Sequence, residues 1–120
     1  MFVTEVFAGT VTMQAKAIAA TSTEVFSLDE MERVAKLRIY LKNTGSVALV
    51  AAVLQGSMDG DNWATLDGSA ITTAFGTLAA SAVATYLVLE ANLRWKYIKL
   101  SLTADTGGTT VVCGLTTVHG

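Results

Sequence analysis

The sequence predicts an all-β fold: an antiparallel β-sandwich or jelly roll of about seven to nine short strands, with at most one short helix. Two observations lead to this prediction. Several segments alternate apolar and polar residues with a period of two, which is the period of side chains along a strand. Turn-forming residues separate these segments at intervals of about 8 to 12 residues, as in sandwiches and barrels. The 120 residues suffice for one domain, residues 1–120.

The first third of the chain contains an arm, a strand and one segment with two interpretations. Residues 1–9, "MFVTEVFAG", are predicted to form an N-terminal arm that leads into a strand within residues 7–20. In "SLDEMERVAKL", Ser27 can cap a helix because Glu30 follows at the spacing of a capping box. Four of the five residues 29–33 are charged, which equally suits an exposed corner. Both interpretations stay open.

The central segments show the period of two most clearly. In "KLRIYLK", residues 36–42, Leu37, Ile39 and Leu41 alternate with lysine, arginine and tyrosine. This pattern predicts a strand with one packed face and one wetter face. "NTGS" then supplies a turn. The next segment, "VALVAAVLQ" at residues 47–55, is apolar on both faces, which predicts a central strand covered on each side.

Three more strands are expected in the second half of the chain. Residues 83–90, "VATYLVLE", alternate again, and residues 94–103, "RWKYIKLSLT", form the next predicted strand. "TADTGGTT" has the glycines of a turn. It leads into the last strand, "TVVCGLTTV", at residues 110–118.

Charge and composition limit the classes of partner. Eight basic and ten acidic residues give a net charge of -2, and nucleic-acid binding is not expected because it requires a concentrated basic patch. Charged residues make up only 15% of the chain and apolar residues 52%. Such a chain either lies in a membrane or buries part of its surface against other subunits.

The longest uncharged stretch does not suit a membrane. Residues 68–89, "GSAITTAFGTLAASAVATYLVL", are interrupted by serine, threonine and glycine, whereas a membrane span needs about 20 predominantly apolar residues. The first residues lack the basic and apolar regions of a signal peptide. We therefore expect a protein made in the cytoplasm, with residues 68–89 contributing to subunit contacts.

No catalytic or cofactor site is predicted. The single cysteine, Cys113, and the single histidine, His119, both lie near the C-terminus, and they do not suggest a nucleophile with its base. Cys113 is instead expected to be a small buried apolar residue. The glycine-rich segments lack the lysine of a phosphate-binding loop and the spacing of a dinucleotide fingerprint. The chain is therefore predicted not to be an enzyme.

A loop with three aspartates is the one candidate metal site. Asp59, Asp61 and Asp67 lie close together in the sequence, and clustered carboxylates suit calcium. The spacing of an EF-hand fails, however, because Trp63 occupies the position of the third oxygen ligand. Turn formation is the preferred interpretation, with Gly60 at a positive φ, and no metal is predicted.

The same loop carries a recognisable pattern. The segment "SMDGDNWATL" is preceded by a glycine, so that a Gly-Ser strand end, an Asp-Gly turn and an Asn-Trp pair follow one another at Gly56, Ser57, Asp59, Gly60, Asn62 and Trp63. Together with "LRWKYIKLSLT" downstream, this pattern resembles discoidin-like domains and many small structural proteins of tailed bacteriophages. The resemblance spans residues 34 to 118 and implies a β-sandwich. It also implies a virion structural protein: a capsid decoration or cement protein, or a neck or tail accessory protein.

Self-association is expected to carry this function. The expected partners are other copies of the chain, most simply in a trimer, and virion proteins such as the major capsid protein. The Trp63 ring is expected to be mostly buried, against its own sheet or a neighbouring subunit. The predicted interface residues are Phe2, Val3, Val6, Phe7, Trp63, Phe75 and Leu78. The alternative function is a carbohydrate-binding module, whose stacking residues would be Trp63, Tyr86, Trp95 and Tyr97.

Overall fold

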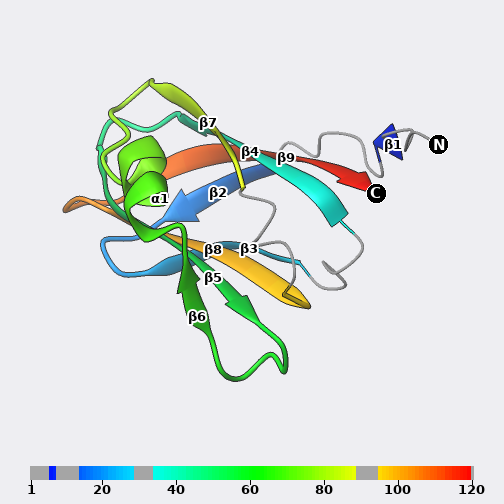
Figure 1. Ribbon diagram of the computed structural model, residues 1–120. Helices are drawn as coiled ribbons and strands as arrows, with labels where there is room; N and C mark the ends of the chain where they lie inside the picture. Colours follow the sequence, from blue (N-terminus) through cyan, green and yellow to red (C-terminus); the bar gives the residue numbers. More distant parts are fainter. Residues whose placement is uncertain (1–5, 8–13, 29–33, 89–94, 120) are drawn as a thin grey trace.

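A computed structural model describes residues 6–7, 14–28, 34–88 and 95–119 (Figure 1). In these residues it contains nine strands and one short helix. The strands form two antiparallel sheets, so the predicted all-β sandwich with at most one short helix is confirmed.

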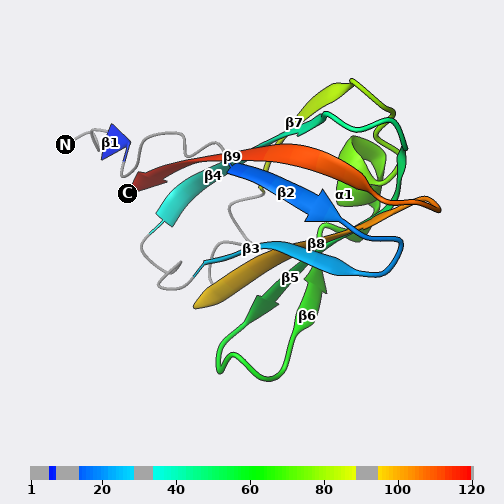
Figure 2. The same cartoon turned by 180° about the vertical axis from the view of Figure 1, so that it is seen from behind.

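The first sheet, sheet A, is organised around the last strand of the chain. Strand β9 pairs with β4 on one side and with both β1 and β2 on the other, and β7 pairs with the far side of β4. Figure 2 shows β2 running beside β9. The strands of sheet A are β1 (Val6–Phe7), β2 (Gln14–Ile18), β4 (Val34–Asn43), β7 (Val83–Leu87) and β9 (Thr109–His119).

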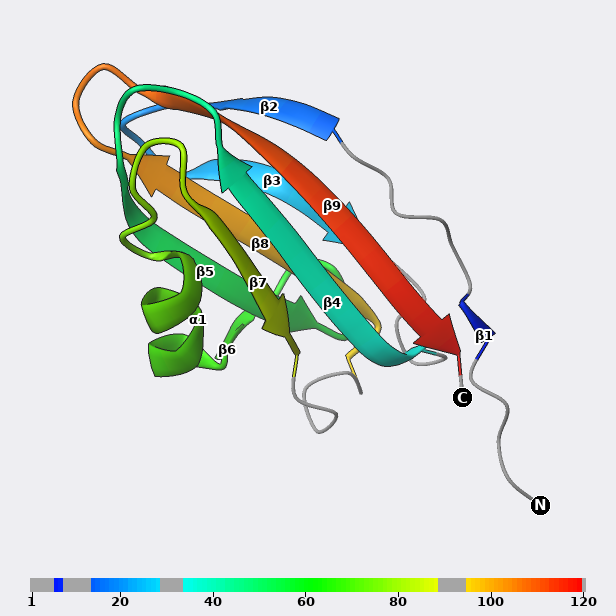
Figure 3. The ribbon, with the colours of Figure 1, turned by 90° about the horizontal axis from the view of Figure 1, so that it is seen from above.

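The second sheet, sheet B, has the strand order β3-β8-β5-β6. In the view of Figure 3, sheet A lies in front and sheet B behind it. The strands of sheet B are β3 (Thr23–Leu28), β5 (Leu49–Ser57), β6 (Ala64–Leu66) and β8 (Tyr97–Ala104).

Alternation within the strands creates the core between the sheets. On β4, Leu37, Ile39 and Leu41 have no exposed surface, and on β8 the same holds for Ile98 and Leu100. The residues between them point outward and are exposed or half-buried. The apolar period of two read from the sequence is therefore the inward face of each sheet. Apolar burial of this kind supplies the main driving force for folding.

Helix α1 (Gly68–Phe75) closes one side of the sandwich, where it packs against β5 and β7 (Figure 1). Ile71 and Phe75 have no exposed surface, because residues four apart share one helix face. Asp67 precedes the helix at a φ of 49° and makes no side-chain capping bond. Its carboxylate accepts a hydrogen bond of 2.5 Å from the Tyr86 hydroxyl on β7 instead.

Two details of the sequence prediction are corrected. A helix over residues 27–37 is not formed, because Ser27 lies in β3 and residues 34–37 lie in β4, while residues 29–33 lie outside the described part. The segment 47–55 is covered on one face only: Val50 and Val53 on β5 are 50% and 37% exposed. None of the described helical segments has the length and apolarity of a membrane-spanning helix.

Candidate functional site

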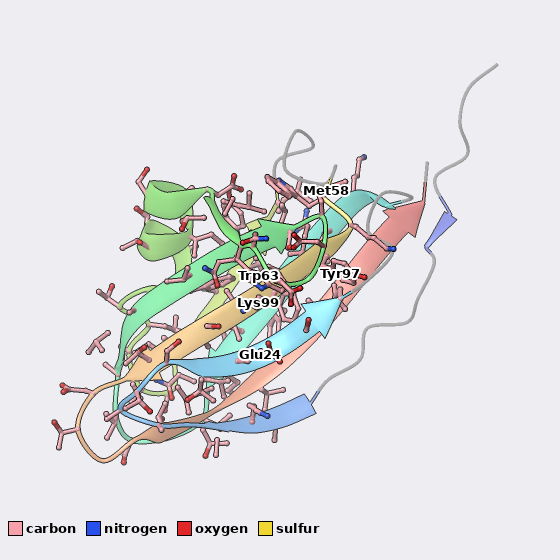
Figure 4. All side chains as sticks on the ribbon, turned by 90° about the horizontal axis from the view of Figure 1, so that it is seen from below. Glu24, Met58, Trp63, Tyr97 and Lys99 are labelled. Atoms are coloured by element: carbon pink, nitrogen blue, oxygen red, sulfur yellow. The ribbon has the colours of Figure 1, made fainter. Side chains whose placement is uncertain are left out.

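The outer face of sheet B carries the tryptophan that the sequence analysis singled out. Strand β8 alternates, so that Tyr97 and Lys99 point outward while Ile98 and Leu100 are buried. Trp63 precedes β6 and is half-buried. The Lys99 ammonium lies over its ring, 4.1 Å from the centroid, in a cation–π contact. Figure 4 shows Trp63, Lys99 and Tyr97 close together on this face.

The loop between β5 and β6 is ordered by its own side chains. Ser57 Oγ accepts hydrogen bonds from the backbone N–H groups of Asp59 (3.3 Å) and Gly60 (2.9 Å), and it donates one to Asp59 Oδ1 (3.0 Å). Asp59 Oδ1 also accepts from the N–H groups of Asp61 and Asn62, both at 2.8 Å. Gly60 has a φ of 82°, as the Asp-Gly turn predicted. The loop spans six residues, 58–63, rather than a tight hairpin turn.

These bonds engage the Asp59 carboxylate in ordering the turn. Hydrogen bonds from the backbone and side chain of Asn62, with others from Asp61 and Ser57, hold the pKa of the Asp59 carboxyl well below its usual range. Asp67 is engaged by Tyr86 next to helix α1, outside this loop. Within the described residues, no three histidine, cysteine, aspartate or glutamate side chains are grouped as metal ligands would be.

The four aromatic residues of the alternative glycan site do not share a surface. Trp63 and Tyr97 lie on the outer face of sheet B, whereas Trp95 packs against the core. A Cβ atom at Gly56 would lie 2.5 Å from the Trp95 ring, so this glycine is what lets the ring cover the end of the core. Tyr86 also packs against the core and meets Phe75 edge-on, with centroids 6.4 Å apart. A four-ring stacking platform is therefore not formed.

Apart from Trp63 on the outer face of sheet B, the predicted interface residues fall into three groups. Phe75 and Leu78 are 0% and 8% exposed, so their side chains lie in the core of one chain. Within the described part of the stretch 68–89, Ile71 and Val88 are buried too, whereas Val83 and Leu87 on β7 are exposed, so that only these two large apolar side chains could meet another subunit. Val6 and Phe7 form β1 on β9 of their own chain. Phe2 and Val3 lie outside the described residues.

The chemical groups that could act as nucleophile and base are far apart. Cys113 is 6% exposed, and burial raises the pKa of its thiol to about 11, as expected for a buried apolar residue. His119 lies six residues further along the same strand, β9. At about 3.3 Å per residue, the two backbone positions are about 20 Å apart, which is too far for proton transfer between them.

The outer face of sheet A carries a combination of side chains that the sequence pattern did not predict. Arg38 and Lys42 on β4 are exposed there, and their partners on β7 are Leu87 and Val83. Both apolar partners are exposed, at 45% and 53%. The alternation of "KLRIYLK" indicated a wetter face but not the apolar residues beside it, because pairing with β7 is not visible in the sequence.

Because Trp63 is half-buried, its replacement by alanine should destabilise the chain less than the loss of a fully buried ring would. Trp63→Ala should lower the free energy of unfolding by about 1 to 2 kcal/mol, from lost apolar burial and the lost cation–π contact. A fully buried ring would instead give about 3 to 5 kcal/mol. Urea unfolding followed by circular dichroism measures the difference. Lys99→Met is the matched control: it keeps the side-chain stem and should cost less than about 1 kcal/mol. An unchanged urea midpoint for Trp63→Ala would show that the ring does not pack on the sheet.

Comparison with known proteins supports the fold. The chain is similar to a chain in a solved structure of Bacillus endospore appendages, described there as forming a novel family of disulfide-linked pili. The TM-score is 0.56 at 12% sequence identity, and the match covers 98% of this chain and 90% of that chain. No protein-family model and no curated protein sequence matches.

Proposed function

We propose that the chain is a non-enzymatic structural subunit that builds an ordered assembly through contacts between its own copies. The observation that carries the proposal is the set of large apolar side chains on its surface. Val50, Val53, Met58, Val83 and Leu87 are between 37% and 62% exposed in a chain with only 15% charged residues. Contact with other subunits removes such side chains from water.

The structural neighbour supports the same class of function. It comes from Bacillus endospore appendages, which are described as pili, and its match covers 98% of this chain. Those pili are described as disulfide-linked, whereas the single cysteine of this chain is 6% exposed and its thiol pKa is raised. A buried thiol with a raised pKa is a poor partner for disulfide exchange. We therefore propose contacts between copies of this chain that do not depend on a disulfide.

The assembly that we propose is the virion of a tailed bacteriophage. The sequence pattern around Trp63 resembles small structural proteins of such phages, and the apolar composition suits a protein packed on a shell. The role is that of a capsid decoration or cement protein, or of a neck or tail accessory protein. Its partners are then other copies of the chain, most simply in a trimer, and the major capsid protein. The N-terminal arm, residues 1–9, is a further proposed contact.

Mass and particle binding test this proposal. The purified chain should show a mass by light scattering of about three times the 12.6 kDa monomer, and it should co-sediment with phage particles that lack it. Deleting residues 1–8 should reduce the mass or the co-sedimentation if the arm is an anchor. A chain that stays monomeric at every concentration and does not bind particles is not a virion subunit, and the proposal would then be wrong.

A further inference from the structure

The outer face of sheet A combines cations with exposed apolar side chains. Arg38 pairs in register with Leu87, and Lys42 pairs with Val83. Residues that pair directly lie on the same face of a sheet, so each cation has an apolar neighbour. We call these four residues the basic face.

The basic face has no acidic residue within the described strands of its own sheet. None of β2, β4, β7 and β9 contains aspartate or glutamate. Neither Arg38 nor Lys42 makes an ion pair with another residue that the structure describes. In a chain whose net charge is -2, a surface of this kind attracts an acidic partner.

A complementary surface exists on the same molecule. The β5–β6 loop exposes Asp59, Asp61 and Met58, which we call the acidic loop, and the Met58 side chain is 62% exposed. The Asp59 carboxylate is engaged in ordering the turn. The Asp61 carboxylate accepts no hydrogen bond and makes no ion pair among the described residues. The hydrogen bonds to Asp59 order the backbone of a loop that carries the exposed Asp61 and Met58, so that little backbone ordering is left to be done on binding.

The two surfaces lie on opposite sides of the sandwich. The acidic loop projects from the sheet B side, away from the strands of sheet A, in both views of Figures 1 and 2. The basic face points outward from sheet A, because the alternate residues Leu37, Ile39 and Leu41 are buried in the core. The loop and the face cannot meet within one chain. Two copies stacked in the same orientation bring them together.

We propose that the acidic loop of one copy docks on the basic face of the next copy. Asp61 faces the two cations, and Met58 contacts the apolar side chains beside them. The contact joins two different surfaces, so it leaves a free loop at one end and a free face at the other. Such a heterologous contact generates a ring if the rotation closes and a filament if it does not. The inference rests on the proposed function, which requires that the chain self-associates.

A second copy suits the basic face better than a nucleic acid does. Phosphate binding draws its affinity from many cations that release counterions, whereas half of this face consists of the exposed apolar residues Val83 and Leu87. The acidic loop supplies negative charge for the cations through its two aspartates and an apolar side chain, Met58, for the apolar residues. Three of the five exposed large apolar residues in the described part of the chain thus lie in the proposed contact.

Charge-reversed variants test the contact through complementation. The first variant, Arg38→Glu with Lys42→Glu, makes the face acidic, and the second, Asp61→Lys, reverses the free charge of the loop. Each variant alone should need at least about tenfold higher concentration than the wild type to associate, because like charges then meet. An equimolar mixture should recover most of the association, because each altered surface meets its complement in the other variant. Sedimentation velocity measures the mass in each case.

Controls separate the contact from net charge and from misfolding. Asp105→Lys makes the same charge change as Asp61→Lys in the exposed loop between β8 and β9, and it should associate like the wild type. Raising the salt from about 0.01 M to about 1 M shortens the Debye length from about 30 Å to about 3 Å, so it should weaken the association of the wild type. This measurement needs no variant and therefore does not depend on whether a variant folds. If the wild type associates but salt has no effect, or folded variants associate normally, or their mixture does not recover, this inference is wrong and the proposed function stands. A wild type that never associates overturns both.

Discussion

Phe75→Ala should lower the free energy of unfolding by about 3 to 5 kcal/mol. The ring has no exposed surface, and it meets Tyr86 edge-on inside the sandwich. Truncation removes its apolar contacts and leaves a cavity between helix α1 and β7 that the surrounding strands can only partly fill. For a domain of this size the melting temperature should fall by more than about 10 °C. Urea unfolding at a concentration where the chain is monomeric gives the free energy directly.

This variant also distinguishes a core residue from an interface residue. Thr73→Ala is the matched control on the exposed side of the same helix, where the hydroxyl donates only to the Ser69 carbonyl at 2.9 Å, and it should change stability by less than about 0.5 kcal/mol. The opposite pattern would restore the interface role that the sequence suggested for Phe75. In that case Phe75→Ala would leave the monomer stable and abolish association.

The strands could be predicted from the sequence because their signal is local. Leu37, Ile39 and Leu41 alternate with charged residues within a single segment, and this alternation becomes the buried face of β4. The Asp-Gly turn is local too, since Gly60 alone supplies the positive φ. Side-chain period and turn chemistry need no knowledge of the rest of the chain.

The helix could not be predicted in the same way. Its sequence, "GSAITTAF", contains one glycine, one serine and three β-branched residues, all with lower helix propensity than alanine. Its remaining signal is the spacing of Ile71 and Phe75, and their burial against β5 and β7 is what stabilises it. Ser27 and Glu30 had the better local helix signal. Ser27 is nonetheless in β3, where it pairs with Lys99, because tertiary pairing outweighed the local preference.

The candidate surfaces could not be predicted from the sequence, because each combines residues that are distant along the chain. Arg38 and Leu87 are distant in the sequence, and only the β4–β7 register places them side by side. The same is true of Lys99 and Trp63, which the folding of β8 beside β5 brings together. The large aromatic ring of Trp63 suggested that it packs against its own sheet or a neighbouring subunit. It did not indicate that one face of the ring would meet an ammonium group instead of the core.

Asn43→Ala should destabilise the chain by about 2 to 4 kcal/mol, because it removes four hydrogen bonds and leaves the buried Thr109 hydroxyl without the oxygen to which it donates. Asn43 has no exposed surface. Its Nδ2 donates to the carbonyls of Val47 and Leu78, at 2.8 and 3.1 Å. Its Oδ1 accepts from Thr109 Oγ1 at 2.7 Å and from the Gly45 N–H at 3.1 Å. One side chain thus joins the β4–β5 turn, the segment after α1 and the start of β9.

The effect should extend to the basic face. The Asn43 backbone also donates to the Ala82 carbonyl at 3.0 Å and accepts from the Ser81 N–H at 2.8 Å. These two bonds lie next to the paired residues Lys42 and Val83. Loosening this junction should weaken association as well as stability. Thr44→Ala is the matched control, since its exposed hydroxyl makes a single bond of 3.0 Å to the Thr110 carbonyl, and it should cost less than about 1 kcal/mol.

A double-mutant cycle with Thr109→Val tests the network itself. Thr109 Oγ1 donates to Asn43 Oδ1, so either substitution removes the same hydrogen bond. The double variant should therefore be more stable than the sum of the two single effects predicts, by about 0.5 to 3 kcal/mol. Urea unfolding of the four proteins gives this coupling energy. Strict additivity would mean that the hydrogen bond between Thr109 and Asn43 contributes nothing, and Asn43 would then stabilise this end of the sandwich only through its bonds to Val47, Leu78 and Gly45.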